Sequence, residues 1–152
     1  MSRLIYLDNA ATTKTAPEVV DAMIPYFTEH YGNPSSVYSF ASGNKEVVSR
    51  QREIIAQALG AQANEIYFTA GGSESDNWAL KATAEAYEKK GKHIITTKIE
   101  HHAILHTCEY LEKQRGFEIT YLDVDENGVV KLDELEKSNS SGYDPYFCDV
   151  CK

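Results

Sequence analysis

The stretch that most constrains this chain is residues 66–81, which read IYFTAGGSESDNWALK. Its first four residues are β-branched or aromatic, a composition that favours a buried strand. Gly71 and Gly72 then break the strand, and Ser73 is predicted to cap a helix, with Asp76 as an imperfect capping-box partner. A strand, a glycine turn and a helix start leave backbone N–H groups and the positive end of a helix dipole at one point. Such a point suits a phosphate group.

The same pattern has a plainer interpretation, because a Gly-Gly turn before a helix is common in α/β proteins. The segment lacks the lysine of a Walker loop and the third glycine of a dinucleotide fingerprint. From the residues alone, a structural turn and a phosphate site therefore both stay open.

Composition narrows the class of protein. The 152 residues are 42% hydrophobic, and no apolar run is long enough to span a bilayer. A formal charge of −8 without a basic stripe argues against a nucleic-acid partner. The chain does not open on a signal-peptide pattern, and its three cysteines do not form a disulfide framework. We therefore expect a cytoplasmic protein that binds neither nucleic acid nor membrane.

Strand-like and helical segments alternate along most of the chain. Strands are expected at residues 4–7, 66–69, 93–97 and 117–122, and helices at 17–30, 37–59, 73–89, from about 101 to Gly116, and from 132 onward. This alternation favours an α/β fold with a mainly parallel sheet, right-handed crossovers and flanking helices.

Three histidines on one predicted helix raise the possibility of a metal site. His102 and His106 are four residues apart and share a face, whereas the adjacent His101 points elsewhere. No cysteine or carboxylate stands at ligand spacing, and the glutamate of a zinc-protease helix is missing. We therefore predict no metal site and take capping or surface positions as the plain alternative. Cys108 has apolar neighbours and is predicted to be a buried structural residue.

Several strings resemble the cysteine desulfurases, which are pyridoxal-phosphate enzymes of the aminotransferase class V group. The strings are YLDNAATT at 6–13, GNPSS at 32–36, TAGGSESDN at 69–77 and EHHAILHTC at 100–108, within a resemblance over residues 4–137. The resemblance implies an incomplete fold type I transferase. An N-terminal segment with the signature loop and helices would occupy residues 1–60, and the first part of the cofactor-binding domain would occupy residues 61–137.

The resemblance also assigns roles to single residues. Gly72 and Ser73 match positions that hold the phosphate of pyridoxal 5'-phosphate, and His101 matches a catalytic histidine that stacks on the cofactor ring and takes part in proton transfer. Four further residues match loops at the substrate end of the site: Asn9, Ala11, Thr12 and Asn33. The family usually has histidine where Tyr38 stands, so no role is assigned there.

The family removes sulfur from L-cysteine, giving alanine and an enzyme persulfide that feeds iron–sulfur cluster or thio-cofactor assembly. Its members are homodimers that pass the sulfur to an acceptor scaffold protein. Their Schiff-base lysine and nucleophilic cysteine match no residue of this chain and lie further along, so the resemblance implies a truncated chain that is inactive alone. The alternative is a non-catalytic module that binds a phosphate ligand or docks on a partner.

Residues 138–152, SNSSGYDPYFCDVCK, do not resemble the family. Cys148 and Cys151 have the spacing of half a zinc ribbon or of a redox pair, but no second pair exists. One adenine inserted near the Lys137 codon converts one coding of the family string AIRPDTILISVMYANN into this tail followed by a stop codon. We therefore expect a frameshifted tail without regular structure.

Overall fold

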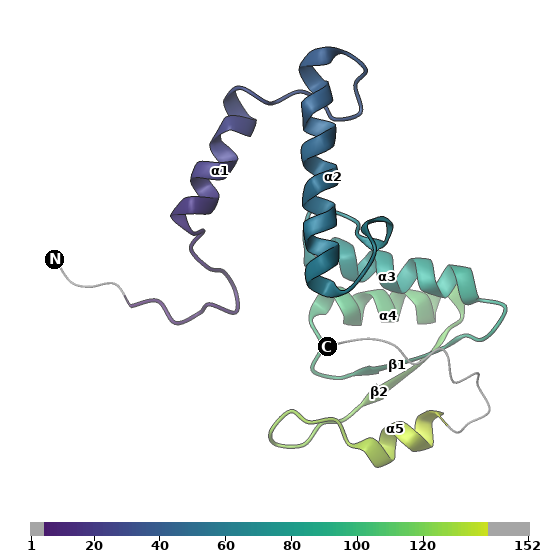
Figure 1. Ribbon diagram of the computed structural model, residues 1–152. Helices are drawn as coiled ribbons and strands as arrows, with labels where there is room; N and C mark the ends of the chain where they lie inside the picture. The colour runs from purple at the N-terminus through teal and green to yellow at the C-terminus, as the bar shows by residue number, and fades with distance from the viewer. Residues whose placement is uncertain (1–4, 140–152) are drawn as a thin grey trace. The chain divides into compact units, whose positions relative to one another are not determined.

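The computed structural model describes residues 5–139, and the chain divides into two compact units, Met1–Tyr67 and Phe68–Lys152. Figure 1 shows the helices and strands of both units. The short 3₁₀-helix η1 (Ala63–Glu65) packs on the preceding helix and belongs to the first unit, and the domain limit expected after residue 60 stays a prediction. No helix among the described residues combines the length and apolar character needed to cross a membrane.

The first unit contains two α-helices, α1 (Pro17–Thr28) and α2 (Ser39–Leu59), followed by η1. Pro17 occupies the first turn of α1, where its missing N–H has no intrahelical acceptor to lose. α2 ends at Gly60, whose φ of 68° lies in the left-handed region that glycine adopts without steric cost. Both boundaries agree with the sequence prediction.

Side-chain hydrogen bonds to the backbone link the segments of this unit, whose α-helices bury only Ala41 and Ala56. The side-chain amide of Asn44 on α2 donates to the carbonyls of His30 and Gly32, each at 2.6 Å. The guanidinium of Arg52 donates to the carbonyl of Ile66 and so ties the segment after η1 back to α2. These bonds attach the first turns and the middle of α2 to neighbouring loops.

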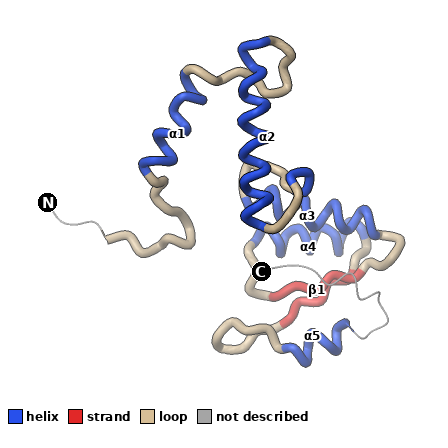
Figure 2. Tube along the Cα trace, in the orientation of Figure 1, coloured by secondary structure: helices blue, strands red, loops and turns tan. Residues whose placement is uncertain are grey.

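The second unit is an α/β arrangement built on a two-stranded parallel sheet (Figure 2). Its elements are α3 (Gly72–Tyr87), β1 (His93–Thr97), α4 (His102–Arg115), β2 (Glu118–Leu122) and α5 (Leu132–Asn139). The register pairs His93 with Glu118 and Thr97 with Leu122. α3 and α4 lie side by side on one side of the sheet, and α5 lies on the other (Figure 1).

A single apolar cluster fills the space between the helix pair and the sheet. Its buried members are Leu80, Ala84, Ile94, Ile104, Cys108, Leu111 and Phe117. Cys108 has no exposed surface, which confirms the prediction that it is a buried structural residue. Gly116 ends α4 with a φ of 69°, also as predicted. The cluster fixes α3 and α4 against one sheet face and thereby aligns their N-terminal ends.

Two predicted strands do not form. Residues 5–7 and 66–69 have no sheet pairing, although Ile66 has an extended backbone with φ −99° and ψ 124°. A strand needs a neighbour to satisfy its backbone hydrogen bonds, and in the described part of the chain β1 and β2 pair only with each other. β-Propensity therefore produced extended chain without a ladder.

The predicted end of regular structure at residue 138 is also wrong by two residues. Ser138 and Asn139 belong to the last turn of α5, and the Ser138 hydroxyl donates to the carbonyl of Glu134 at 2.8 Å. A helix propagates by such local bonds, whatever sequence family the residues belong to. The rest of the tail, with Cys148 and Cys151, lies outside the described residues, so the frameshift prediction stays a prediction.

Candidate functional site

The first helical residue of α3 is Gly72. Ser73 is therefore the second residue of the helix and not its N-cap. Gly71 precedes it as the N-cap, with an extended backbone. The carboxylate of Glu74 accepts the backbone N–H of Ala70 at 2.6 Å, which satisfies a donor just outside the helix. The N-cap therefore lies at Gly71, two residues before the serine that the sequence pattern predicts.

The start of α3 has backbone N–H donors that precede its first intrahelical hydrogen bonds. The first intrahelical bonds run from the N–H groups of Glu74 and Ser75 to the carbonyl of Gly71, at 3.1 and 3.2 Å. The N–H groups of Gly72 and Ser73 come before these and are among the donors that a helix start leaves without an intrahelical acceptor. A Cβ built on Gly72 would meet no atom within 4 Å. The position that a side chain would occupy at Gly72 is therefore open.

His101 is the N-cap of α4, and its ring is held by the backbone. Its Nδ1 accepts the N–H of Ala103 at 3.1 Å. In the neutral ring the proton then resides on Nε2, because one nitrogen of a neutral imidazole accepts and the other donates. Between β1 and His101, the Thr97 hydroxyl donates to Glu100 at 3.0 Å and closes the connecting turn.

Ser73 and His101 line the same open groove, of about 400 Å³, between α3 and α4. The other residues that line it are Asn77, Lys81, His102, Ala103, His106, Thr107 and Tyr110. Gly72 adjoins Ser73 at the helix start. The three predicted cofactor residues therefore gather at the N-terminal ends of two neighbouring helices, on the same side of the sheet.

A polar network inside the groove was missed at the sequence level. The Asn77 side-chain oxygen accepts from the Thr107 hydroxyl and from the Lys81 ammonium, each at 2.8 Å. The Lys81 ammonium also lies 5.1 Å from the centre of the Tyr110 ring. Asn77 follows Ser73 by one helical turn, and that spacing was the available signal. Its partner on α4 required the tertiary structure.

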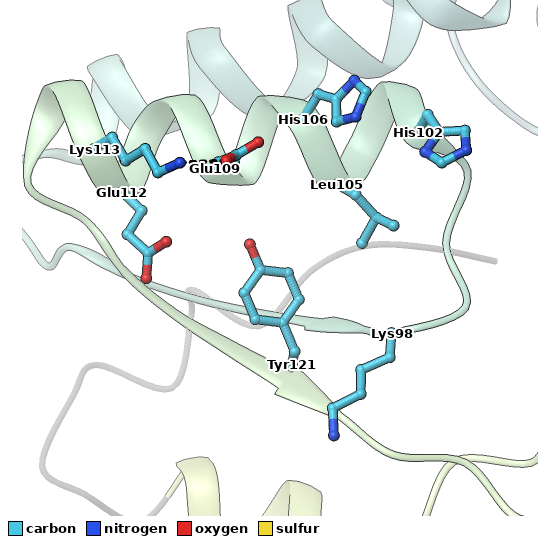
Figure 3. A pocket seen from close by; sticks show the side chains of 8 residues that line it. All are labelled: Lys98, His102, Leu105, His106, Glu109, Glu112, Lys113 and Tyr121. Carbon is cyan, nitrogen blue, oxygen red and sulfur yellow. Dashed lines mark hydrogen bonds and ion pairs between the residues drawn. The ribbon is translucent and has the colours of Figure 1, made fainter.

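A second open groove, of about 410 Å³, lies along the opposite flank of α4 (Figure 3). The rings of His102 and His106 stack there with centroids 5.2 Å apart, and Glu109 pairs with Lys113 along the same helix. Tyr121 on β2 lies beneath them, and burial raises the pKa of its hydroxyl. Among the described residues no group of three or more potential metal ligands occurs.

The predicted substrate-loop residues all belong to the first unit and are exposed. Asn9, Ala11 and Thr12 form a turn in which the last two donate their N–H groups to the carbonyl of Asp8, at 3.2 and 3.4 Å. The side-chain oxygen of Asn33 accepts the N–H of Ser35 at 2.9 Å. These loop residues belong to the first unit, whereas Ser73 and His101 belong to the second.

Comparison with known proteins identifies one family, and the match extends seven residues past Lys137, where the resemblance was expected to end. The family described as Aminotransferase class-V matches residues 5–144. The cysteine desulfurase IscS of Clostridium botulinum (strain Kyoto / Type A2) is 56% identical over 138 residues, which cover 91% of this chain and 34% of that protein. The chain therefore spans about a third of the length of the curated relatives it matches.

Two solved structures extend the similarity to the fold. A NifS-like protein superposes with a TM-score of 0.80 at 45% identity, over 85% of this chain and 35% of that one. SspA in complex with cysteine superposes with a TM-score of 0.78 at 36% identity, over 91% of this chain and 38% of that one. The two-stranded sheet with its helices is thus part of the NifS-like fold.

Proposed function

Since this chain belongs to the aminotransferase class-V family, we propose that it supplies the phosphate-binding turn and the ring-stacking histidine of a pyridoxal-phosphate-dependent cysteine desulfurase. One observation carries the proposal: Ser73 at the start of α3 and His101 at the start of α4 line one groove. The similarity to cysteine desulfurases supports the substrate class.

The residues at the start of α3 fit a phosphate group. A phosphate needs several donors and a positive potential, and the N–H groups of Gly72 and Ser73 provide both at a helix start. The Ser73 hydroxyl adds a further donor. Gly72 carries no side chain into the open space, so a ligand can approach the backbone there.

His101 is suited to cover a flat ring and to hold a proton. Its bond to the Ala103 N–H fixes the ring plane and directs the other nitrogen away from the helix backbone. Nε2 is then the atom at which His101 would take up or release a proton next to the reacting atoms. When bound, pyridoxal phosphate would supply the electron-withdrawing ring that the chemistry on the amino acid requires.

The finer expectations are part of the same proposal. L-cysteine is the proposed substrate, and the solved SspA complex with cysteine supports that choice. Asn9, Ala11, Thr12 and Asn33 are proposed to serve the substrate end of the site. A homodimer, a sulfur-acceptor scaffold protein and a cytoplasmic location stay predictions of the resemblance. So does a role in iron–sulfur cluster or thio-cofactor assembly.

We further propose that this chain does not release sulfur by itself. Cys108 has no exposed surface, which makes it unsuitable as a sulfur carrier. Lys81 lines the groove, but its ammonium is bound to Asn77. The family's reactive lysine and cysteine match none of the residues here. The purified chain should therefore bind the cofactor and yield no sulfide from L-cysteine.

Ser73→Asp tests the phosphate site directly. A carboxylate in the first turn favours the helix dipole, so the variant should keep α3 intact while repelling the phosphate. We expect pyridoxal 5'-phosphate affinity to fall by at least about tenfold, measured by fluorescence titration. Ser49→Asp adds the same charge to the exposed middle of α2 and should leave the affinity unchanged. Equal affinities for the two variants would refute the phosphate assignment.

The ring-stacking role can be separated from the capping role. His101→Asn keeps an efficient N-cap and removes the aromatic ring, so α4 should stay folded while the affinity for pyridoxal 5'-phosphate falls. His102→Asn, at the next residue, is the matched control. A larger loss in the control than in His101→Asn would assign the stacking role to His102 instead.

A further inference from the structure

We infer that Asn77 and Thr107 are positioning residues that hold the start of α3 in fixed register with the start of α4. Through this link they would set the distance between Ser73 and His101. The inference rests on the proposed function, since it concerns how a ligand that spans both residues is gripped.

The orientation of the Asn77 amide is determined by three hydrogen bonds. Its oxygen accepts from the Thr107 hydroxyl and the Lys81 ammonium, each at 2.8 Å, and these donors occupy both of its lone pairs. Its nitrogen donates to the carbonyl of Ser73 at 2.9 Å. A flipped amide would place its N–H groups against the Lys81 ammonium and its oxygen against the Ser73 carbonyl, so only one orientation is compatible with these two partners. The amide thus connects α4 directly to the first turn of α3.

Burial makes this link hard to replace. Thr107 is only 3% exposed and is flanked along α4 by core residues such as Ile104 and Leu111. A buried hydroxyl without a partner is costly, so its bond to Asn77 favours one placement of the two helices. Water reaches the hydroxyl poorly at such a position and cannot readily substitute for the amide.

The link lies close to the residues that it would position. Asn77 is one turn after Ser73 on α3, and Thr107 is less than two turns after His101 on α4. Lys81 contacts Tyr110 about one turn further along both helices. The two helices therefore run in the same direction past each other. A slip by one residue would shift one helix start by about 1.5 Å relative to the other. A rigid ligand that spans both starts would sense that shift.

The affinities for three ligands should respond differently when the register between α3 and α4 is loosened. Under the proposed function, pyridoxal 5'-phosphate would contact both ends of the site, whereas pyridoxal and inorganic phosphate would each contact one end. Loosening the register should weaken the spanning ligand and leave the two partial ligands nearly unchanged, because only the former requires a fixed distance. A purely structural role would weaken all three together.

Thr107→Val is the decisive variant, because it removes the hydroxyl and keeps the side-chain shape. We expect its affinity for pyridoxal 5'-phosphate to fall about three- to tenfold, as expected for one lost hydrogen bond. Thr107→Ser should restore the affinity. Thr96→Val is the matched control, since the Thr96 hydroxyl is also buried but has no hydrogen-bond partner among the described residues. Its affinities should equal those of the parent chain.

A ligand-free measurement keeps the two proposals distinguishable. The side-chain NH₂ of Asn77 should exchange with solvent several-fold faster in Thr107→Val than in the parent or in Thr107→Ser, as followed by NMR. If the parent binds pyridoxal 5'-phosphate no better than pyridoxal, the proposed function fails. If the parent binds normally while Thr107→Val matches it in affinity and exchange, the positioning role fails. Equal losses for all three probes would also overturn it.

Discussion

The two units of this chain carry similar apolar patterns but bury them to very different extents. In the second unit, residues from α3, β1 and α4 form a closed cluster in which Leu111 is 2% exposed. In the first unit, α1 has no buried residue, and its apolar side chains are about half exposed, as for Met23 at 47% and Ile24 at 50%. α2 buries only Ala41 and Ala56.

The contrast shows what an amphipathic pattern specifies. Periodicity predicts which face of a helix is apolar, but the hydrophobic stabilisation appears only where another element covers that face. The second unit provides the cover through its sheet and helix pair. In the first unit, side-chain bonds from Asn44 and Arg52 to the backbone hold the segments instead. The candidate site at Ser73 and His101 therefore lies in the unit that buries more apolar side chains.

The largest expected difference between the units comes from truncating a leucine in each. Leu111→Ala removes a fully packed side chain and should destabilise the second unit by about 2–5 kcal/mol. Leu59→Ala removes a side chain that is 71% exposed, so its cost should stay within about 0.5 kcal/mol. Urea unfolding followed by circular dichroism measures both. Similar losses of stability in the two variants would contradict the difference in burial between the two units.

Alanine at two helix glycines should act in opposite directions. Gly116 ends α4 in the left-handed region, so Gly116→Ala should destabilise by about 1–2 kcal/mol. Gly43 lies inside α2, where a Cβ would meet no atom within 4 Å, so Gly43→Ala should stabilise by about 0.5–1 kcal/mol. Thermal unfolding compares the variants, and an equal sign for both would contradict the assigned helix ends.

Arg52→Gln tests whether polar contacts hold the first unit. Losing the guanidinium bond to the Ile66 carbonyl should free residues 61–67 and cost about 0.5–1.5 kcal/mol of local stability. Hydrogen exchange of the amides in that segment should accelerate several-fold. Arg50→Gln, on the exposed surface two residues earlier, is the matched control. No change in exchange would show that this contact is dispensable.

The smallest expected effect is a pH dependence that is present in the turn at Asp125 and absent from the similar turn at Asn33. Asp125 accepts the N–H groups of Val129 and Asn127 at 2.8 and 2.9 Å, and these bonds hold its pKa below the ordinary value of 3.8. The stabilisation is complete above that value and is lost as the pH falls through the folded-state pKa. At the corresponding turn in the first unit, Asn33 accepts from Ser35 with an amide that does not titrate.

NMR titration of the two turns between pH 6 and pH 2, a range of about four units around the ordinary carboxyl pKa, measures this difference. The amide signals of Asn127 and Val129 should shift with a midpoint below 3.8, and the Ser35 amide should not follow that titration. Asp125→Asn should abolish the shift at the first two. A midpoint at or above 3.8 would contradict the hydrogen-bonded carboxylate.

Features governed by neighbours along the chain could be predicted from the sequence. The helix ends at Gly60 and Gly116, the strand at 93–97 and the turn ending at Gly128 all agree, because a cap or a turn depends on a few adjacent residues. The burial of Cys108 followed from its apolar neighbours on a helix. The family resemblance predicted that Ser73 and His101 serve one site; both line one groove, and their roles toward a cofactor stay predictions.

Tertiary structure decided the features that need a partner from elsewhere in the chain. Residues 66–69 have strand propensity but no available neighbour, so they form no strand. Asn77 and Thr107 meet only because the core packs α3 against α4 on one sheet face. Local propensity depends on nearby residues, whereas a contact between helices depends on the free energy of packing them together.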